Sequence, residues 1–241
     1  MSAPDALLLF EKRQNVAWLT LNRPQVLNAV NMAMRDELWQ AMLAVRDDPE
    51  VKAVVIRGAG RSFCAGADIT EFGTAPSYLE AREARHERDL WALVLSIPKP
   101  IIAAIQGHAY GAGCEMSLCC DLRVASEDAV FALPETNLGY IPSAGGTQLL
   151  PRFIGPAAAL GMILSAEPIG AARALQLGLV QRVVPREHLD YAVEELATLL
   201  AAQPPAAMAA AKRVLAEGQD LPLVEALALT ARVSEPLLSS H

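Results

Sequence analysis

Two turns rich in glycine and alanine constrain the fold of this chain more than any other feature of its sequence. The first, residues 62–69 (SFCAGADI), follows the apolar run 53–56, and the second, residues 105–115 (IQGHAYGAGCE), follows the apolar run 101–105. Each turn leads into a segment of helical character, so one strand–turn–helix unit occurs twice. This recurrence predicts an α/β core built from successive similar turns, not a string of independent domains.

The segments around these turns continue the alternation of strands and helices. Asn31 is a predicted helix cap, because the helix after it places four apolar residues on one face before residues 47–49 end it. Those four residues are Met34, Leu38, Met42 and Val45. The other predicted strands are residues 16–21, 122–125 and 130–132, and the other predicted helices are residues 68–72, 78–96, 114–120 and a helix from Thr147 after a turn at 142–146.

The character of the chain changes after residue 184. Three helices are predicted there, at residues 187–202, 204–217 and 221–234, separated by prolines. We therefore divide the chain into a core, residues 1–184, and a C-terminal helical region, residues 185–241. The high alanine and leucine content of this region predicts packing against a further surface, of which another subunit is one example.

Composition narrows the classes of function. The 241 residues are 53% hydrophobic and carry a net charge of −7, which favours a large core and argues against a nucleic-acid partner. No apolar run approaches the roughly 18 residues of a membrane span, and residues 1–10 have no signal-peptide pattern. The four cysteines show neither CxxC nor zinc spacing. We expect a soluble cytoplasmic protein with reduced thiols and no metal.

The two turns also have a chemical implication. The first N–H groups of a helix lack internal partners, so two helix starts that face one another would offer two donors to one anionic oxygen. Glu115 lies in the first turn of the second helix, and Glu135 follows Pro134. Two carboxyls brought together titrate as a coupled pair and can supply a base and an acid. Each signal is weak alone, since such turns and glutamates are common in packing and on surfaces.

A third segment completes a specific pattern. Residues 133–135 (LPE) and 139–147 (GYIPSAGGT) follow the two turns, and the three segments in this order resemble the signature of the enoyl-CoA hydratase/isomerase (crotonase) family. The resemblance covers residues 16–234 and is most specific at 102–122. It implies a spiral of repeated ββα units, a C-terminal helical region that forms trimers or hexamers, and an acyl-CoA substrate.

The resemblance also implies the roles of individual residues. The amides of Ala67 and Ala112 would bind the thioester oxygen, Glu115 would activate water for attack at Cβ, and Glu135 would protonate Cα. No cofactor beyond the coenzyme A of the substrate is implied. The residues expected to line the CoA and thioester are Arg23, Ala29, Ala65, Gly66, Asp68, Ile69, Thr70 and Gly111.

Glutamates at both positions favour enoyl-CoA hydratase, a hydro-lyase suited to fatty-acid oxidation, since related Δ3,Δ2-isomerases typically keep only the second. Isomerisation or another crotonase reaction is the first alternative, because this fold supports several chemistries. A non-catalytic CoA- or RNA-binding protein is an alternative of another class. A structural trimer with a degenerate site is the third, and the two intact glutamates argue against it.

Overall fold

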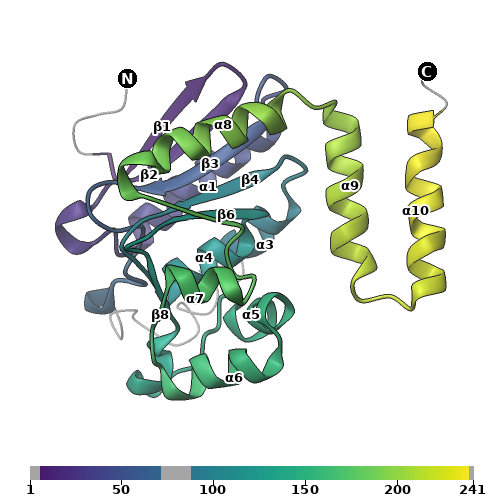
Figure 1. Cartoon of the computed structure of the whole chain (residues 1–241). Coiled ribbons are helices and arrows are strands. Elements are labelled where there is room, and N and C mark those ends of the chain that lie inside the picture. The colour runs from purple at the N-terminus through teal and green to yellow at the C-terminus, as the bar shows by residue number, and fades with distance from the viewer. Residues whose placement is uncertain (1–5, 72–87, 239–241) are drawn as a thin grey trace.

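The chain folds around one large sheet and one small sheet in a computed structural model, which describes residues 6–71 and 88–238 (Figure 1). The large sheet has the order β1-β2-β3-β4-β6-β9, and the small one has the order β5-β7-β8. All pairs in the large sheet are parallel except β1 with β2. The strands of the large sheet are β1 (Leu8–Arg13), β2 (Val16–Leu21), β3 (Ala53–Gly58), β4 (Ile101–Ile105), β6 (Leu122–Ser126) and β9 (Arg182–Val184).

Side chains alternate between the two faces of the large sheet, and both faces are covered. On β2, Ala17 and Leu19 join the core under α1 (Met32–Asp47), α3 (Leu90–Ser96) and α4 (Ala112–Cys119), whereas Val16 and Trp18 join the core under α8 (Leu189–Ala201). Strands buried on both faces have continuous apolar sequences. This explains why the strand predicted at 16–21 coincides with β2.

The predicted recurrence of turns is confirmed as a ββα spiral. A strand of the large sheet is followed by a strand of the small sheet and then by a helix in the units β4–β5–α4 and β6–β7–η3. In the preceding unit an isolated bridge from Cys64 to Ala109 takes the place of the second strand before η2. The bounds of these elements are β5 (His108–Tyr110), β7 (Val130–Ala132), β8 (Ile169–Gly170), η2 (Ile69–Glu71) and η3 (Pro134–Leu138).

Two predicted boundaries near the second turn are wrong. The turn contains strand β5, which pairs with β7, and one helix and one strand separate the two in the sequence. The helix begins at Ala112, two residues before the predicted start, because Gly111 adopts φ 49° and reverses the chain there. Ala112 is therefore the first residue of α4. Of the helix predicted at 78–96, residues 78–87 lie outside the described residues.

A layer of short helices completes the lower part of the molecule in Figure 1. The first packs on α4, the second on η3, and the third on β7, β8 and β9. These three helices are α5 (Gly146–Ile154), α6 (Pro156–Ser165) and α7 (Ala171–Gln176). Two single-turn elements lie elsewhere in the chain: η1 (Pro24–Val26) precedes α1, and η4 (Arg186–His188) precedes α8.

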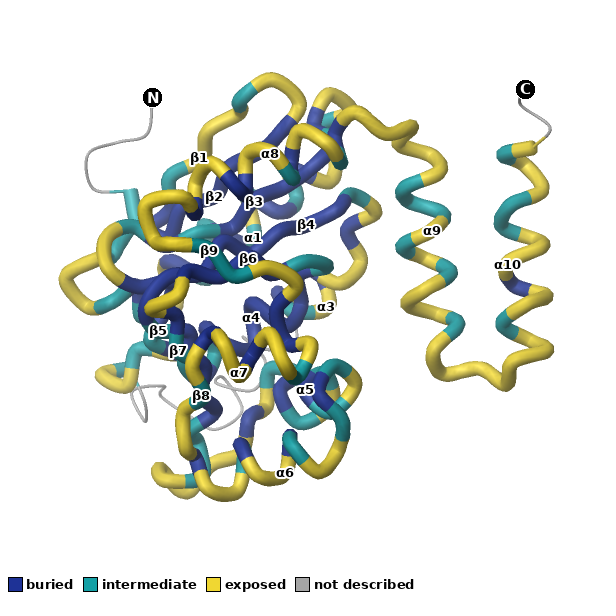
Figure 2. Tube along the Cα trace, viewed as in Figure 1, coloured by how far each residue is buried: buried dark blue, intermediate teal, exposed yellow. Residues whose placement is uncertain are grey.

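The C-terminal helices α9 (Pro205–Gly218) and α10 (Leu223–Leu238) form a hairpin that stands away from the body (Figures 1 and 2). The structure thus confirms a helical C-terminal region, but α8, on the C-terminal side of the predicted boundary at 184, packs on the large sheet. The predicted end of the last helix at residue 234 is too early, because α10 continues through Pro236 to Leu238. Among the described residues, no helix has the length and apolarity needed to cross a membrane.

Candidate active site

The two small-residue turns lie side by side. The amide of Cys64 donates to the carbonyl of His108 at 2.9 Å, and the amide of Tyr110 donates to the carbonyl of Cys64 at 2.9 Å. Gly113 makes this approach possible, because a Cβ on it would lie 2.4 Å from the Cys64 carbonyl oxygen. Tertiary structure therefore joins segments that are separated by more than forty positions of sequence.

Two backbone amides are unused at this junction. The neighbours of Ala67 pair with Val30, since Val30 N–H donates to Gly66 at 2.8 Å and Asp68 N–H donates to Val30 at 2.9 Å. This pairing leaves the Ala67 amide without a protein acceptor in the described part of the chain. Ala112, as the first residue of α4, has no acceptor within its helix either. Both amides are therefore available to a bound oxygen.

Glu115 is buried beneath this junction and is held by backbone donors. Its side chain is 3% exposed, and its Oε1 accepts hydrogen bonds from Ala144 N–H at 2.8 Å and Gly146 N–H at 2.9 Å. Burial raises the pKa of Glu115 to about 7, although the two amides lower it and the charge of Glu135 raises it further. Near neutral pH this carboxyl is poised to exchange a proton.

Glu135 lies on the other side of the second turn. Its Oε1 would be 3.1 Å from a Cβ placed on Gly111, so the absence of a side chain at Gly111 makes room for the carboxyl. Its Oε2 is buried without a hydrogen-bond partner among the described residues, and burial raises the pKa of Glu135 above its usual range. A buried oxygen with no donor favours the protonated acid.

The two carboxyls and the two amides lie around the junction of the two turns, an arrangement suited to acid–base chemistry. Burial is the main cause of the raised pKa of Glu115, and the charge of Glu135 raises this pKa to a smaller extent. Among the described residues no group of three His, Cys, Asp or Glu side chains could hold a metal ion.

The remaining predicted site residues form a strip beside the first turn. Ala65 N–H donates to Leu27 at 2.9 Å, which aligns residues 27–30 with residues 65–68. Ala29 and Ala65 are partly exposed along this strip, Gly66 is buried in it, and Ile69 and Thr70 are exposed at its end. Gly111 lies across the junction, because a Cβ on it would be 3.8 Å from the Cα of Gly66.

Arg23 and Asp68 occupy the same strip and bind one another. Arg23 Nη1 lies 2.9 Å from Asp68 Oδ2 and donates to the Ala29 carbonyl at 2.6 Å. The other Asp68 oxygen accepts from Thr70 N–H at 3.2 Å and Thr70 Oγ1 at 2.7 Å. Both members of the pair are therefore already engaged within the protein.

Sequence reasoning missed two supports of this site. Asn28 is fully buried, accepts from Arg23 N–H at 2.9 Å, and donates to the carbonyls of Ala59 and Ser62 at 2.9 and 2.8 Å. The amides of Ala144 and Gly146 hold Glu115 from 29 and 31 residues away. The role of Asn28 could have been suspected from the sequence, because Asn28 is the one polar residue in the apolar stretch 26–30. The sequence contains no signal that identifies the amides bound to Glu115.

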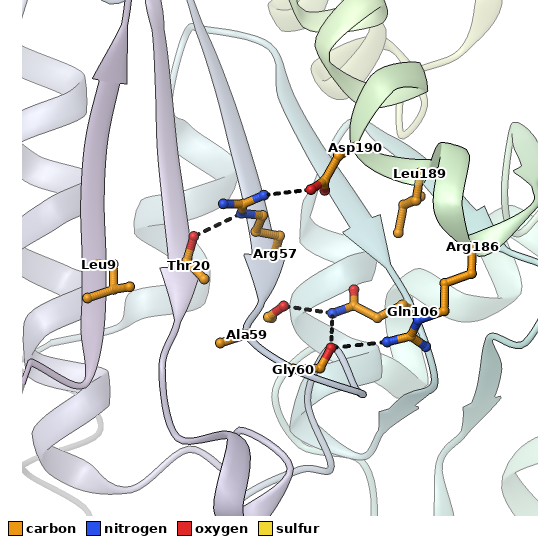
Figure 3. Close-up of a pocket in the computed structure, with 10 residues that line it drawn as sticks. Leu9, Thr20, Arg57, Ala59, Gly60, Gln106, Arg186, Leu189 and Asp190 are labelled. Atoms are coloured by element: carbon orange, nitrogen blue, oxygen red, sulfur yellow. Dashed lines mark hydrogen bonds and ion pairs between the residues drawn. The ribbon is translucent and has the colours of Figure 1, made fainter.

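The cavity in Figure 3 is not part of this site. It has a volume of about 400 Å³ and lies on the α8 side of the large sheet, where Leu189 and Asp190 line it. Its arginines are already paired, Arg57 with Asp190 at 3.1 Å and Arg186 with Asp128 and the Gly60 carbonyl. Neither cation is free for a ligand, and the carboxyls of the site are absent from its walls.

The burial of Glu115 predicts a stability effect. Between its ordinary pKa of 4.5 and about 7 the folded protein retains a proton that the unfolded chain releases, so the folded state loses stability as pH rises through this window. A glutamine side chain at this position would keep the Oε1 acceptor without the charge. We expect Glu115→Gln to raise the free energy of unfolding by ~1–3 kcal/mol at pH 8 and to have little effect at pH 4.5. Urea unfolding at both pH values measures this, and an equal change at both would contradict it.

The fold and the candidate site together describe a class of protein, an α/β spiral in which two small-residue turns lie beside two buried carboxyls. The sequence profile of the enoyl-CoA hydratase/isomerase family matches residues 11–241. The chain belongs to this family.

Individual relatives agree with this assignment. The chain is 42% identical to 2,3-dehydroadipyl-CoA hydratase of Escherichia coli (strain K12), over 92% of this chain and 86% of that protein. It is 38% identical to crotonyl-CoA hydratase of Syntrophomonas wolfei, over 93% and 86%. The crystal structure of an enoyl-CoA hydratase from Bacillus anthracis superposes with a TM-score of 0.92 at 34% identity, covering 97% of this chain and 92% of that one. The fold is therefore the crotonase fold.

Proposed function

We propose that the chain catalyses the reversible addition of water to a 2-enoyl-CoA, which gives a 3-hydroxyacyl-CoA. The observation that carries the proposal is the pairing of two buried carboxyls, Glu115 and Glu135, with the unused amides of Ala67 and Ala112. The names of two relatives support hydration, because 2,3-dehydroadipyl-CoA hydratase and crotonyl-CoA hydratase are both named as hydratases of 2-enoyl-CoA thioesters.

In the proposed reaction the thioester oxygen accepts hydrogen bonds from Ala67 and Ala112. These donors stabilise the negative charge that develops on this oxygen when water adds at Cβ. Glu115 is fixed through Oε1 by two amides, so its Oε2 is left to orient the water and take its proton. Glu135 acts as the protonated acid, because its Oε2 is buried and no described residue donates to it, and it delivers a proton to Cα. The reverse reaction uses the same groups.

The CoA portion is proposed to follow the strip beside the first turn. Backbone groups dominate there, and small side chains allow a long ligand to approach closely. The strip leads directly to the Ala67 amide, which supports a path that ends with the thioester at the site. The residues of the strip are Arg23, Ala29, Ala65, Gly66, Asp68, Ile69, Thr70 and Gly111, and among them Arg23 and Asp68 are bound to one another.

The direct test is the loss of enoyl-thioester absorbance when purified protein is mixed with crotonyl-CoA or with 2,3-dehydroadipyl-CoA, the substrates named for two relatives. We expect rapid loss with at least one of them and a 3-hydroxyacyl-CoA product. Conversion of a 3-enoyl-CoA to a 2-enoyl-CoA without hydration would instead identify an isomerase.

The α9–α10 hairpin supports a further proposal, that the chain forms a homotrimer or a pair of trimers. Lys212 of α9 contacts Lys99 and Asp121 of the body, but α10 stands away from it, and most of the hairpin is coloured as exposed or intermediate in Figure 2. Large apolar residues are among the exposed ones. An exposed apolar surface of this kind is typical of a subunit interface. The exposed residues are Leu215, Leu223, Val224, Leu227 and Leu238. Light scattering on the purified chain is expected to give a mass of three or six chains, and a monomer would contradict the proposal.

A further inference from the structure

The ion pair between Arg23 and Asp68 is placed where it can control an amide of the site. Asp68 is the residue after Ala67, and both side chains of the pair are largely shielded, 15% and 13% exposed. Arg23 Nη1 holds Asp68 and the Ala29 carbonyl at once, so it ties the two aligned segments together across the strip. Movement of either segment would break one of these contacts.

The segment that carries Arg23 is itself held rigidly. Leu27 and Asn28 have φ angles of 53° and 58°, a left-handed conformation that is costly for residues other than glycine. The hydrogen bonds of the buried Asn28 stabilise this conformation, and it presents the Leu27 carbonyl to Ala65 N–H. Residues 23–30 therefore form a fixed template against which residues 65–68 are aligned.

We propose that Arg23 and Asp68 are positioning residues that fix the direction of the Ala67 N–H. The inference rests on the proposed function, since it concerns the amide that binds the thioester oxygen. The ion pair holds Asp68, the residue on the C-terminal side of Ala67, and the bridge between Val30 and Ala67 holds the backbone of the turn. Without the pair, residues 67–68 gain freedom and the donor is no longer preorganised.

A role for Arg23 as a ligand of CoA phosphates is the competing explanation. Its guanidinium would have to exchange an anionic partner at 2.9 Å for a solvated phosphate, at little gain in charge neutralisation. The two explanations differ in the part of the substrate that they involve. Phosphate binding requires the nucleotide of CoA, whereas positioning acts on the thioester.

The test compares crotonyl-CoA with crotonyl-pantetheine, a thioester that lacks the nucleotide, for Arg23→Gln, Asp68→Asn and the double variant. We expect each single variant to lower kcat by about tenfold on both thioesters. The double variant is expected to be no slower than the slower single variant, since one interaction is lost in all three. Arg182→Gln, which breaks the exposed pair of Arg182 with Glu195 at 3.2 Å, is the matched control and should change nothing.

A loss that appears in KM and only with crotonyl-CoA would overturn the proposal in favour of phosphate binding, and multiplied losses in the double variant would also overturn it. Binding of acetoacetyl-CoA gives a second readout, because a working pair of amides stabilises its enolate, which has its own ultraviolet band. The variants should weaken this band even if the wild-type protein hydrates neither crotonyl thioester. A weakened hydration with an unchanged enolate band would contradict positioning. If Arg23→Gln does not fold, Arg23→Lys replaces it in the same measurements, because lysine keeps the positive charge but lacks the guanidinium group.

Discussion

Replacing Glu135 with glutamine is expected to lower the hydration of a 2-enoyl-CoA at least about a hundredfold, because proton transfer by a positioned acid typically contributes a factor of this size or more. The amide keeps the shape of the carboxyl and its place over Gly111 but cannot deliver a proton to Cα. CoA binding should change little, since the carboxyl lies at the reacting end of the strip. Steady-state rates from enoyl-thioester absorbance, with CoA affinity measured by calorimetry, test both statements.

Glu115→Gln is expected to cause a loss of similar size for a different reason. The side-chain oxygen of the new glutamine would still accept the amides of Ala144 and Gly146, so the loop 144–146 stays in place and only the base is removed. Glu127→Gln, on the exposed surface, is the matched control and should retain full activity. Near-normal turnover by either Glu115→Gln or Glu135→Gln would refute the mechanism with two carboxyls.

The second large effect is expected from Ala112→Pro, which removes one amide donor from the site. Proline is tolerated at the first position of a helix, and Ala112 has that position in α4. Gly111 before it has no Cβ to clash with the proline ring. Loss of one donor of this kind typically lowers kcat by about 10²–10³, and the ring would also occupy the space of the thioester oxygen.

Ala112→Gly supplies the matched control for this experiment. Glycine keeps the N–H and removes only the methyl group, so the variant should turn over close to the wild-type rate. Thermal unfolding by circular dichroism should give similar melting temperatures for both variants. If Ala112→Pro folds normally and still turns over at the wild-type rate, the Ala112 amide has no part in the reaction.

The local elements of the fold could be predicted because their signals are local. Strand β2 has the predicted bounds, and α1 has both the predicted cap and the predicted face. The Asn31 side chain accepts from Met34 N–H, and the four buried residues of α1 are the four predicted. Periodicity and capping act within a few residues, so they can be read without knowledge of the partners.

The position of β5 could not be read in this way. Its three residues stand among glycines and alanines that favour a turn, and only pairing with β7 makes them a strand. The start of α4 could not be predicted either, because it depends on the positive φ of Gly111. Gly111 has no Cβ, and this leaves room for the Glu135 carboxyl. Both errors arise because contacts distant in sequence override local preference.

The sequence by itself determined the recurrence of strand and turn, the family, and the presence of two glutamates near two small-residue turns. Tertiary structure alone decided that Glu115 is held by the amides of Ala144 and Gly146 and that Arg23 is paired with Asp68. The physical reason is that residue types and spacing record what each segment can form locally. Burial, pKa and the direction of an N–H are properties of groups that meet only after the chain has folded.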